Sequence, residues 1–181
     1  MKEFVFAWVV LWSMVFIPVS SWAQEDCEAT PVKIHGNSLA PLVANGADIM
    51  MKPVSCAGEI RHGDFVIFES GASEMPVIKT VRAIAGDRFA IEDGYIIING
   101  EKQQTSTGEY YRLTGGRDKM LKLYQDSFNG IVPENVFLVL GDRPHGAIDS
   151  SRIGFVHLND IIMVGMVEGI LKESTVEKEE K

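Results

Sequence analysis

The sequence has few of the residues on which several classes of function depend. Its 181 residues include only two cysteines and four histidines. The cysteines are far apart and the histidines are scattered, so no Cys-x-x-Cys pair and no histidine cluster indicates a metal site. The formal net charge of −8 argues against nucleic-acid binding, because such proteins usually carry a basic surface patch. We therefore expect no metal, no cofactor and no nucleic-acid partner.

The sequence also lacks a G-x-S-x-G motif, the turn that carries the nucleophile in many Ser–His–Asp hydrolases. His35 is too close to Ser38 in sequence to be its natural partner across a turn. His62, His145 and His157 have no motif context of this kind. A serine–histidine triad is therefore not the preferred interpretation of the chain.

Hydrophobic residues make up 46% of the chain and charged residues 23%, which is typical of one globular domain with a core. Short apolar runs separated by turns predict a mainly β fold of twisted antiparallel sheets, with a barrel-like shape. Asn99-Gly100 is a strong hairpin signal. Residues 101–130 are more polar, and we interpret them as a loop-rich insert with one short helix or ribbon. The predicted strands are 65–68, 77–85, 88–91, 95–98, 136–140, 155–158 and 161–167.

The N-terminus is a separate element. Residues 4–17 are apolar without a polar face, which predicts an N-terminal apolar helix. Ser21-Trp22-Ala23 places small residues three and one positions before Gln24, the pattern of a signal-peptide cleavage site. Residues 1–23 are therefore a cleaved signal peptide or a retained single membrane anchor, and both interpretations stay open.

Either interpretation places the domain that follows, residues 24–172, outside the cytoplasm. Lys2 precedes the apolar run and acidic residues follow it, which is the charge order of an exported domain. The charged tail, residues 173–181, is expected to be flexible. In this compartment an even number of cysteines permits a disulfide. We hypothesise a bridge between Cys27 and Cys56, and two free buried thiols are the alternative.

Residues 32–53 predict a strand, a turn that begins with glycine, and a second strand. Gly36 frees the backbone just before Ser38, and Pro41 prevents a helix behind the serine. Taken alone, this stretch indicates an ordinary turn with a solvated serine.

Lys79 is the residue that changes this interpretation. On a strand it shares one face with Val77 and Val81. Burial there lowers the pKa of a lysine, and the resulting neutral amine can act as a base on a serine hydroxyl. The alternative is a surface lysine on an edge strand.

Several motifs occur along the chain in a fixed order that resembles the type I signal peptidase family, the membrane-bound Ser–Lys proteases. The resemblance covers roughly residues 32–170, and the short chain looks most like the small members, such as the TraF-type maturation peptidases of conjugative transfer systems. The motifs are G-N-S-L-A-P at 36–41, G-D-F-V-I-F at 63–68, I-K-T-V-R-A-I-A-G-D at 78–87, I-I-I-N-G at 96–100, V-P-E-N-V-F-L-V-L-G-D at 132–142 and D-S-S-R-I-G at 149–154.

The resemblance implies that Ser38 is the nucleophile and that Lys79 is the general base. It also implies that the Ser38 backbone N–H forms part of the oxyanion hole. The family has a serine or threonine two positions before the nucleophile, where this chain has Gly36, so that side-chain donor is missing.

The last motif departs further from the family. The serine that hydrogen-bonds the lysine in the family falls on Ala147 here. Asp149 and Ser150 match, whereas the arginine comes one place late, at Arg152. We expect a buried Asp149–Arg152 salt bridge, or Ser150 in the place of the missing serine. A purely structural network of Asp142, Asp149 and Arg152 is the alternative to a direct catalytic role.

The resemblance implies a serine endopeptidase that cleaves exported precursors, either signal peptides or pilin-like substrates, after small residues. Membrane lipid is then a second partner, with the catalytic domain facing the periplasm. A dedicated maturation peptidase of a conjugation or secretion system is one alternative. A non-catalytic periplasmic assembly factor with the same fold is another, because Gly36 and Ala147 lack the hydroxyls of the family.

Overall fold

A computed structural model describes residues 27–144 and 147–171. The apolar segment 1–23 and the charged tail 173–181 lie outside the described residues. The predicted mainly β, antiparallel fold is confirmed, since every strand pairing in the described part of the chain is antiparallel. The strands are β1 (Thr30–Lys33), β2 (Asp48–Pro53), β3 (Phe65–Phe68), β4 (Val77–Ala83), β5 (Phe89–Glu92), β6 (Tyr95–Ile98), β7 (Glu101–Lys102), β8 (Val136–Leu140), β9 (Val156–His157) and β10 (Ile161–Leu171).

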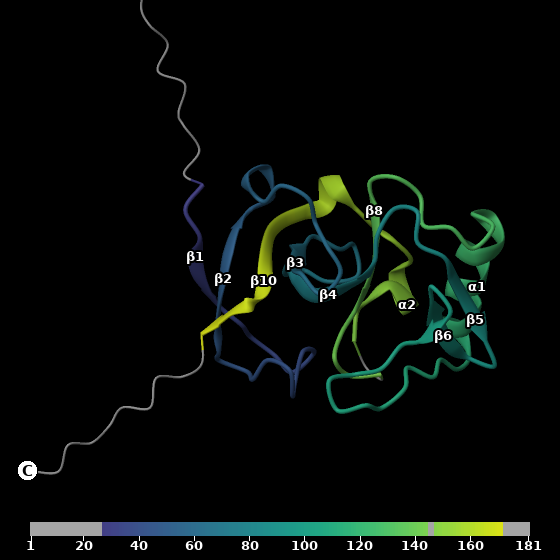
Figure 1. The fold of residues 1–181 in the computed structure, drawn as a ribbon. Coiled ribbons are helices and arrows are strands. Elements are labelled where there is room, and N and C mark those ends of the chain that lie inside the picture. The colour runs from purple at the N-terminus through teal and green to yellow at the C-terminus, as the bar shows by residue number, and fades with distance from the viewer. Residues whose placement is uncertain (1–26, 145–146, 172–181) are drawn as a thin grey trace, which may run out of the picture.

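The main sheet has seven strands in the order β1-β2-β10-β3-β4-β8-β9, and β5, β6 and β7 form a second, three-stranded sheet. Figure 1 shows β1 and β2 at one side of the molecule and the second sheet at the other. The main sheet is open, with β1 and β9 as its edges. The barrel-like part of the prediction is therefore not seen, because no ladder joins these edges within residues 27–144 and 147–171.

The predicted hairpin at Asn99-Gly100 is confirmed. Both residues have positive φ angles, 51° and 85°, and they join β6 to β7 with Ile98 opposite Glu101. Asp93 and Gly94 connect β5 to β6 with the same signs of φ. A two-residue turn of this kind matches the twist of the flanking strands, which is why these short sequences specify the second sheet.

The insert contains helix α1 (Gly116–Ser127), which packs its buried Leu121 against the core of the second sheet. Tyr124 and Phe128 of this segment contact Phe155, which follows the short helix α2 (Ser150–Ile153). The insert is thus joined to the part of the chain that carries the last sequence motif. Within the described residues, no helix has both the length and the apolar composition needed to cross a membrane.

Cys27 and Cys56, the pair that we hypothesised to be bridged, form a disulfide in the structure. Cys27 precedes the edge strand β1, and Cys56 lies in the short 3₁₀ turn η1 (Val54–Cys56) after β2. The bond therefore encloses both strands that flank Ser38 in sequence.

Removing this bridge is expected to destabilise the domain. The bond joins positions 29 residues apart. A closed loop of that length lowers the entropy of the unfolded chain, and we expect the Cys27→Ala/Cys56→Ala variant to lose roughly 3 kcal/mol of unfolding free energy. Urea unfolding measures this, with the wild type under reducing conditions as a second comparison. An unchanged unfolding midpoint would contradict a stabilising role.

Candidate active site

The turn that carries Ser38 is fixed by buried residues that follow the serine and by a glycine that precedes it. Ser38 itself is half-buried, whereas the next residue, Leu39, and Val43 are fully buried in the core around β2 and β3. The Val43 N–H donates to the Leu39 carbonyl at 2.9 Å, which closes the turn. On the other side, Gly36 has a φ of 91°, a conformation that favours glycine.

Lys79 lies in the middle of the main sheet. Its strand, β4, pairs with β3 on one side and β8 on the other, and Val66 of β3 is opposite Lys79. The side chain is only 2% exposed. The alternative of a surface lysine on an edge strand is therefore wrong. A run of β-branched residues puts β4 in the interior of the sheet, and this position carries the lysine into the core.

The Lys79 amine contacts the Ser38 hydroxyl directly. Its Nζ lies 2.9 Å from Ser38 Oγ and donates to the Ile78 carbonyl at 2.6 Å. Burial lowers the pKa of Lys79 from 10.5 to about 8, although the nearby Asp149 carboxylate acts in the opposite direction. Nζ is the donor in both contacts. A neutral amine has two N–H donors for them and one lone pair, which can accept a proton.

Gly141 and Asp142 follow β8, and both lie against the backbone of the turn that carries Ser38. The Asp142 N–H donates to the Ser38 carbonyl at 2.8 Å. The Asp142 carboxylate, which is buried, accepts from the Leu42 N–H at 3.2 Å. The predicted site residue Asp142 therefore holds the backbone of the serine turn and does not contact the Ser38 hydroxyl or the Lys79 amine.

The backbone at Gly141 leaves no space for a side chain. A Cβ atom there would lie 2.7 Å from the Ser38 carbonyl oxygen and 3.1 Å from the Ala147 Cβ. The Ala147 methyl group therefore packs beside Gly141, whose Cβ position is 3.6 Å from Lys79 Cδ. The Cβ position of Gly141 thus has Ala147 Cβ and Lys79 Cδ as neighbours, and alanine has no hydroxyl to offer there.

Adding one methyl group at Gly141 is expected to disturb the site. Gly141→Ala should displace the Ser38 carbonyl and lower the unfolding free energy by about 1–3 kcal/mol, the usual cost of overpacking. Cleavage by the variant should fall as well. Gly71→Ala is the matched control, because a Cβ at Gly71 meets nothing within 4 Å. Equal stability and activity of the two variants would contradict this account of the packing.

The structure corrects two expectations about the last motif. The Ser150 hydroxyl accepts from the Val139 N–H at 2.8 Å, so it stabilises β8 and does not replace the missing serine beside Lys79. Arg152 is exposed, and the described residues contain no Asp149–Arg152 ion pair. The reason is local, because Asp149 is the N-cap of α2 and accepts from the Ser151 N–H and hydroxyl.

Three side chains of the insert contact the segment 141–147. Ser106 donates both its N–H and its hydroxyl to the Asp142 carboxylate, at 2.7 Å and 2.5 Å. The buried Tyr111 hydroxyl donates to the Gly141 carbonyl, and Arg117 donates to the carbonyls of Pro144 and Ala147 at 3.2 Å and 3.0 Å. None of these three residues is among the site residues predicted from the sequence. No local pattern indicates contacts that span about 30 residues of chain.

The structure also shows what the other histidines contact and whether side chains gather to bind a metal. His62 pairs with Asp87 at 2.6 Å, and His157 accepts from the Asn159 N–H. His145 lies outside the described residues. Among the described residues, no group of three or more His, Cys, Asp or Glu side chains is arranged to hold a metal ion.

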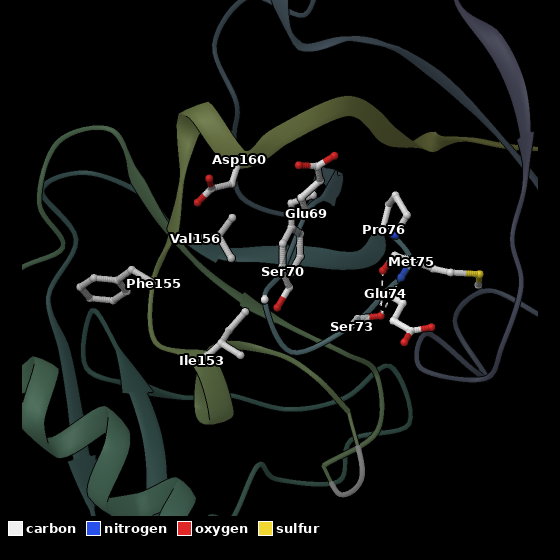
Figure 2. Close-up of a pocket in the computed structure, with 12 residues that line it drawn as sticks. Glu69, Ser70, Ser73, Glu74, Met75, Pro76, Ile153, Phe155, Val156 and Asp160 are labelled. Carbon is white, nitrogen blue, oxygen red and sulfur yellow. Dashed lines mark hydrogen bonds between the residues drawn. The ribbon is translucent and has the colours of Figure 1, made fainter.

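A pocket of about 560 Å³ lies beside the strand that carries Lys79, but neither Ser38 nor Lys79 lines it. Figure 2 shows that one wall is the loop before β4, with Ser70, Ser73 and Pro76, and that the other wall includes Ile153 and Val156. Pro76 directly precedes β4. The chemistry of the site therefore does not take place in this pocket.

A serine hydroxyl held by a buried lysine amine, within an antiparallel β domain, is the arrangement of a Ser–Lys hydrolase. Residues 1–170 match the family described as signal peptidase, peptidase S26. Signal peptidase I of Bacillus caldolyticus is 28% identical over 133 residues, which cover 71% of this chain and 72% of that protein. Signal peptidase IB of Staphylococcus aureus strain COL is 22% identical over 170 residues, which cover 90% and 87%. A signal peptidase I structure from Enterococcus faecalis V583 aligns with a TM-score of 0.41 and 24% identity, over 63% of this chain and 97% of that one.

The chain belongs to the signal peptidase, peptidase S26, family. This is a family of serine proteases, so the protein is a hydrolase with a serine signal peptidase function. The relatives are named signal peptidases. They do not favour the alternatives of a dedicated maturation peptidase or a non-catalytic assembly factor.

Proposed function

We propose that Ser38 is the nucleophile of this signal peptidase and that Lys79 is its general base. The observation that carries the proposal is the 2.9 Å contact between the hydroxyl of the half-buried Ser38 and the amine of the buried Lys79. At this separation a proton can pass directly from Oγ to Nζ. The lowered pKa of Lys79, about 8, supports the role because it leaves a usable fraction of neutral amine near neutral pH.

In the proposed reaction, neutral Lys79 takes the proton of Ser38 Oγ as the oxygen attacks the scissile carbonyl. The tetrahedral oxyanion accepts a hydrogen bond from the Ser38 backbone N–H, which donates to no group among the described residues. The protonated amine then gives its proton to the leaving amine, and an ester on Ser38 remains. Water, deprotonated by Lys79, hydrolyses this ester and restores the hydroxyl.

An exported precursor would bind as an extended strand beside the Ser38 segment. β1 is an edge strand of the main sheet and leads directly into the residues before Ser38. Main-chain hydrogen bonds to such an edge would give affinity, and small pockets beside it would select small side chains before the cut. The Cys27–Cys56 disulfide, which bonds the start of β1 to η1, supports an oxidising compartment outside the cytoplasm.

The proposed organisation assigns residues 24–172 to the catalytic domain and 173–181 to a flexible tail. Residues 1–23 attach the domain to the cytoplasmic membrane, facing the periplasm, unless they are cleaved as a signal peptide. N-terminal sequencing of the protein from membranes distinguishes the two, because a start at Met1 or Lys2 indicates an anchor and a start at Gln24 indicates cleavage.

Cleavage of a reporter precursor tests the proposed function. The full chain in detergent is incubated with a precursor that carries an Ala-x-Ala site, and mass spectrometry locates the cut. We expect one cut directly after the second alanine. A matched precursor with arginine in place of that alanine is the control and should remain intact. Absence of cleavage, or equal cleavage of both precursors, would contradict the proposal.

A further inference from the structure

The Asp142 carboxylate is buried and lies between two segments that are distant in sequence. Only 2% of the residue is exposed. Within residues 27–144 and 147–171 it has no ion-pair partner. A buried carboxylate without a counter-ion is costly unless N–H and O–H donors surround it. Ser106 supplies two of these donors, at 2.7 Å and 2.5 Å, and the Leu42 N–H supplies a third at 3.2 Å.

Asp142 in turn holds both ends of the turn that carries the nucleophile. Its N–H donates to the Ser38 carbonyl at 2.8 Å, and its carboxylate accepts from Leu42 on the far side of the turn. The 2.9 Å contact between Ser38 and Lys79 depends on where this turn lies. Ala147 has no hydroxyl, and within residues 27–144 and 147–171 the Lys79 amine bonds only to Ser38 and to the Ile78 carbonyl.

Ser106 is exposed and belongs to a turn of the insert that is stabilised by its own hydrogen bonds. The Gly108 N–H donates to the Thr105 carbonyl at 3.0 Å, and the Thr105 N–H donates to the Glu109 carbonyl at 2.9 Å, so the turn is held by backbone bonds. A turn that is held independently presents the Ser106 donors to Asp142 in a fixed position. Ser106 of the insert is thereby linked to the nucleophile turn through the Asp142 carboxylate.

We propose that Ser106 is a positioning residue for the cleavage reaction, and that it acts through Asp142 to keep the Ser38 turn in register with Lys79. The inference rests on the proposed Ser38–Lys79 mechanism. Ser106 touches neither the reacting atoms nor Lys79. Its loss therefore changes the rate of the chemical step by altering how Ser38 is placed relative to Lys79, while both side chains of the dyad are still present.

The test compares Ser106→Ala, Ser106→Thr and the matched control Thr107→Ala with the wild type. Thr107 is an adjacent exposed residue whose hydroxyl contacts Thr105 and not Asp142. Ser106→Ala should lower kcat by roughly tenfold to a hundredfold with little change in KM, because small displacements of reacting groups are costly. Ser106→Thr keeps both donors and should restore kcat, and Thr107→Ala should behave like the wild type.

Hydrogen exchange of residues 38–43 supplies a readout that does not depend on turnover. Loss of the Ser106 hydroxyl should accelerate exchange in this turn, whereas Thr107→Ala should leave it protected. Thermal unfolding of each variant shows that the domain remains folded.

The proposal is overturned if Ser106→Ala keeps the wild-type kcat, if Thr107→Ala loses as much, or if Ser106→Thr fails to restore kcat. These results differ from failure of the proposed function. In that case the wild type would not cleave the precursor, or Ser38→Ala would still cleave it. Normal turnover by Ser106→Ala alongside an inactive Ser38→Ala would remove only the positioning role.

Discussion

Ser38→Ala and Lys79→Ala should each abolish measurable cleavage of a precursor with an Ala-x-Ala site. We expect kcat/KM to fall by roughly 10⁴-fold or more in either variant, since removing one member of a nucleophile–base pair costs nearly as much as removing both. The double variant should therefore be no slower than either single variant. A quantitative gel or fluorescence assay over a wide range of enzyme concentrations measures these rates.

Matched controls separate chemistry from folding. Ser127→Ala removes an exposed serine whose hydroxyl bonds within α1, and Lys102→Ala removes an exposed strand lysine, so both should cleave like the wild type. Lys79→Met keeps most of the side-chain volume in the core while it removes the amine. It should remain folded and inactive. Substantial activity in Ser38→Ala, Lys79→Ala or Lys79→Met would contradict the roles of Ser38 as nucleophile and Lys79 as general base.

Cleavage should rise steeply with pH in the range where Lys79 loses its proton. The protonated amine has no lone pair and cannot act as a base, and burial lowers the pKa of Lys79 to about 8. Below that value kcat/KM should rise about tenfold per pH unit, and it should level off above it, for roughly a hundredfold gain between pH 6 and pH 9. Single-turnover cleavage across this range measures the profile.

Tyr111 and His62 are two other titratable residues, and neither is expected to produce this dependence of cleavage on pH. Burial raises the pKa of Tyr111 to about 12, so its hydroxyl stays protonated and continues to donate to Gly141 over the whole range. His62 is paired with Asp87, and His62→Gln should leave the midpoint of the profile unchanged. Cleavage that is indifferent to pH between 5 and 9 would contradict a lysine base.

Elements with a strong local pattern could be predicted from the sequence. β8 was predicted at 136–140, its observed bounds, because an unbroken apolar run between two turns has one consistent interpretation. β4 and the Asn99-Gly100 hairpin are correct for the same reason. Ser38 and Lys79 were singled out by the fixed order of the motifs that resemble the type I signal peptidase family, since the Ser38 stretch alone indicates an ordinary turn. The direct contact between them is long-range, because the two positions are 41 apart in sequence.

The contacts that surround the pair could not be predicted. Ser106 and Arg117 lie in a polar segment without periodicity, and their partners are buried groups far along the chain. The exposed position of Arg152 was also missed. Residues 141–154 are polar and predict a loop, so helix α2 was not expected there. Asp149 followed by two serines is nevertheless consistent with a helix N-cap. Once α2 forms, Asp149 bonds to Ser151 and Arg152 points elsewhere.

Covalent labelling of the nucleophile tests the central claim most directly. A short peptide that ends in alanine and carries an activated p-nitrophenyl ester acylates the attacking residue and releases nitrophenolate. Rapid acid quenching followed by peptide mapping locates the acyl group, with Ser38→Ala and Lys79→Met as matched comparisons. The account predicts a burst of nitrophenolate and an acyl group on Ser38, with no burst in either variant. An acyl group on any other residue, or an equal burst in Ser38→Ala, would contradict it.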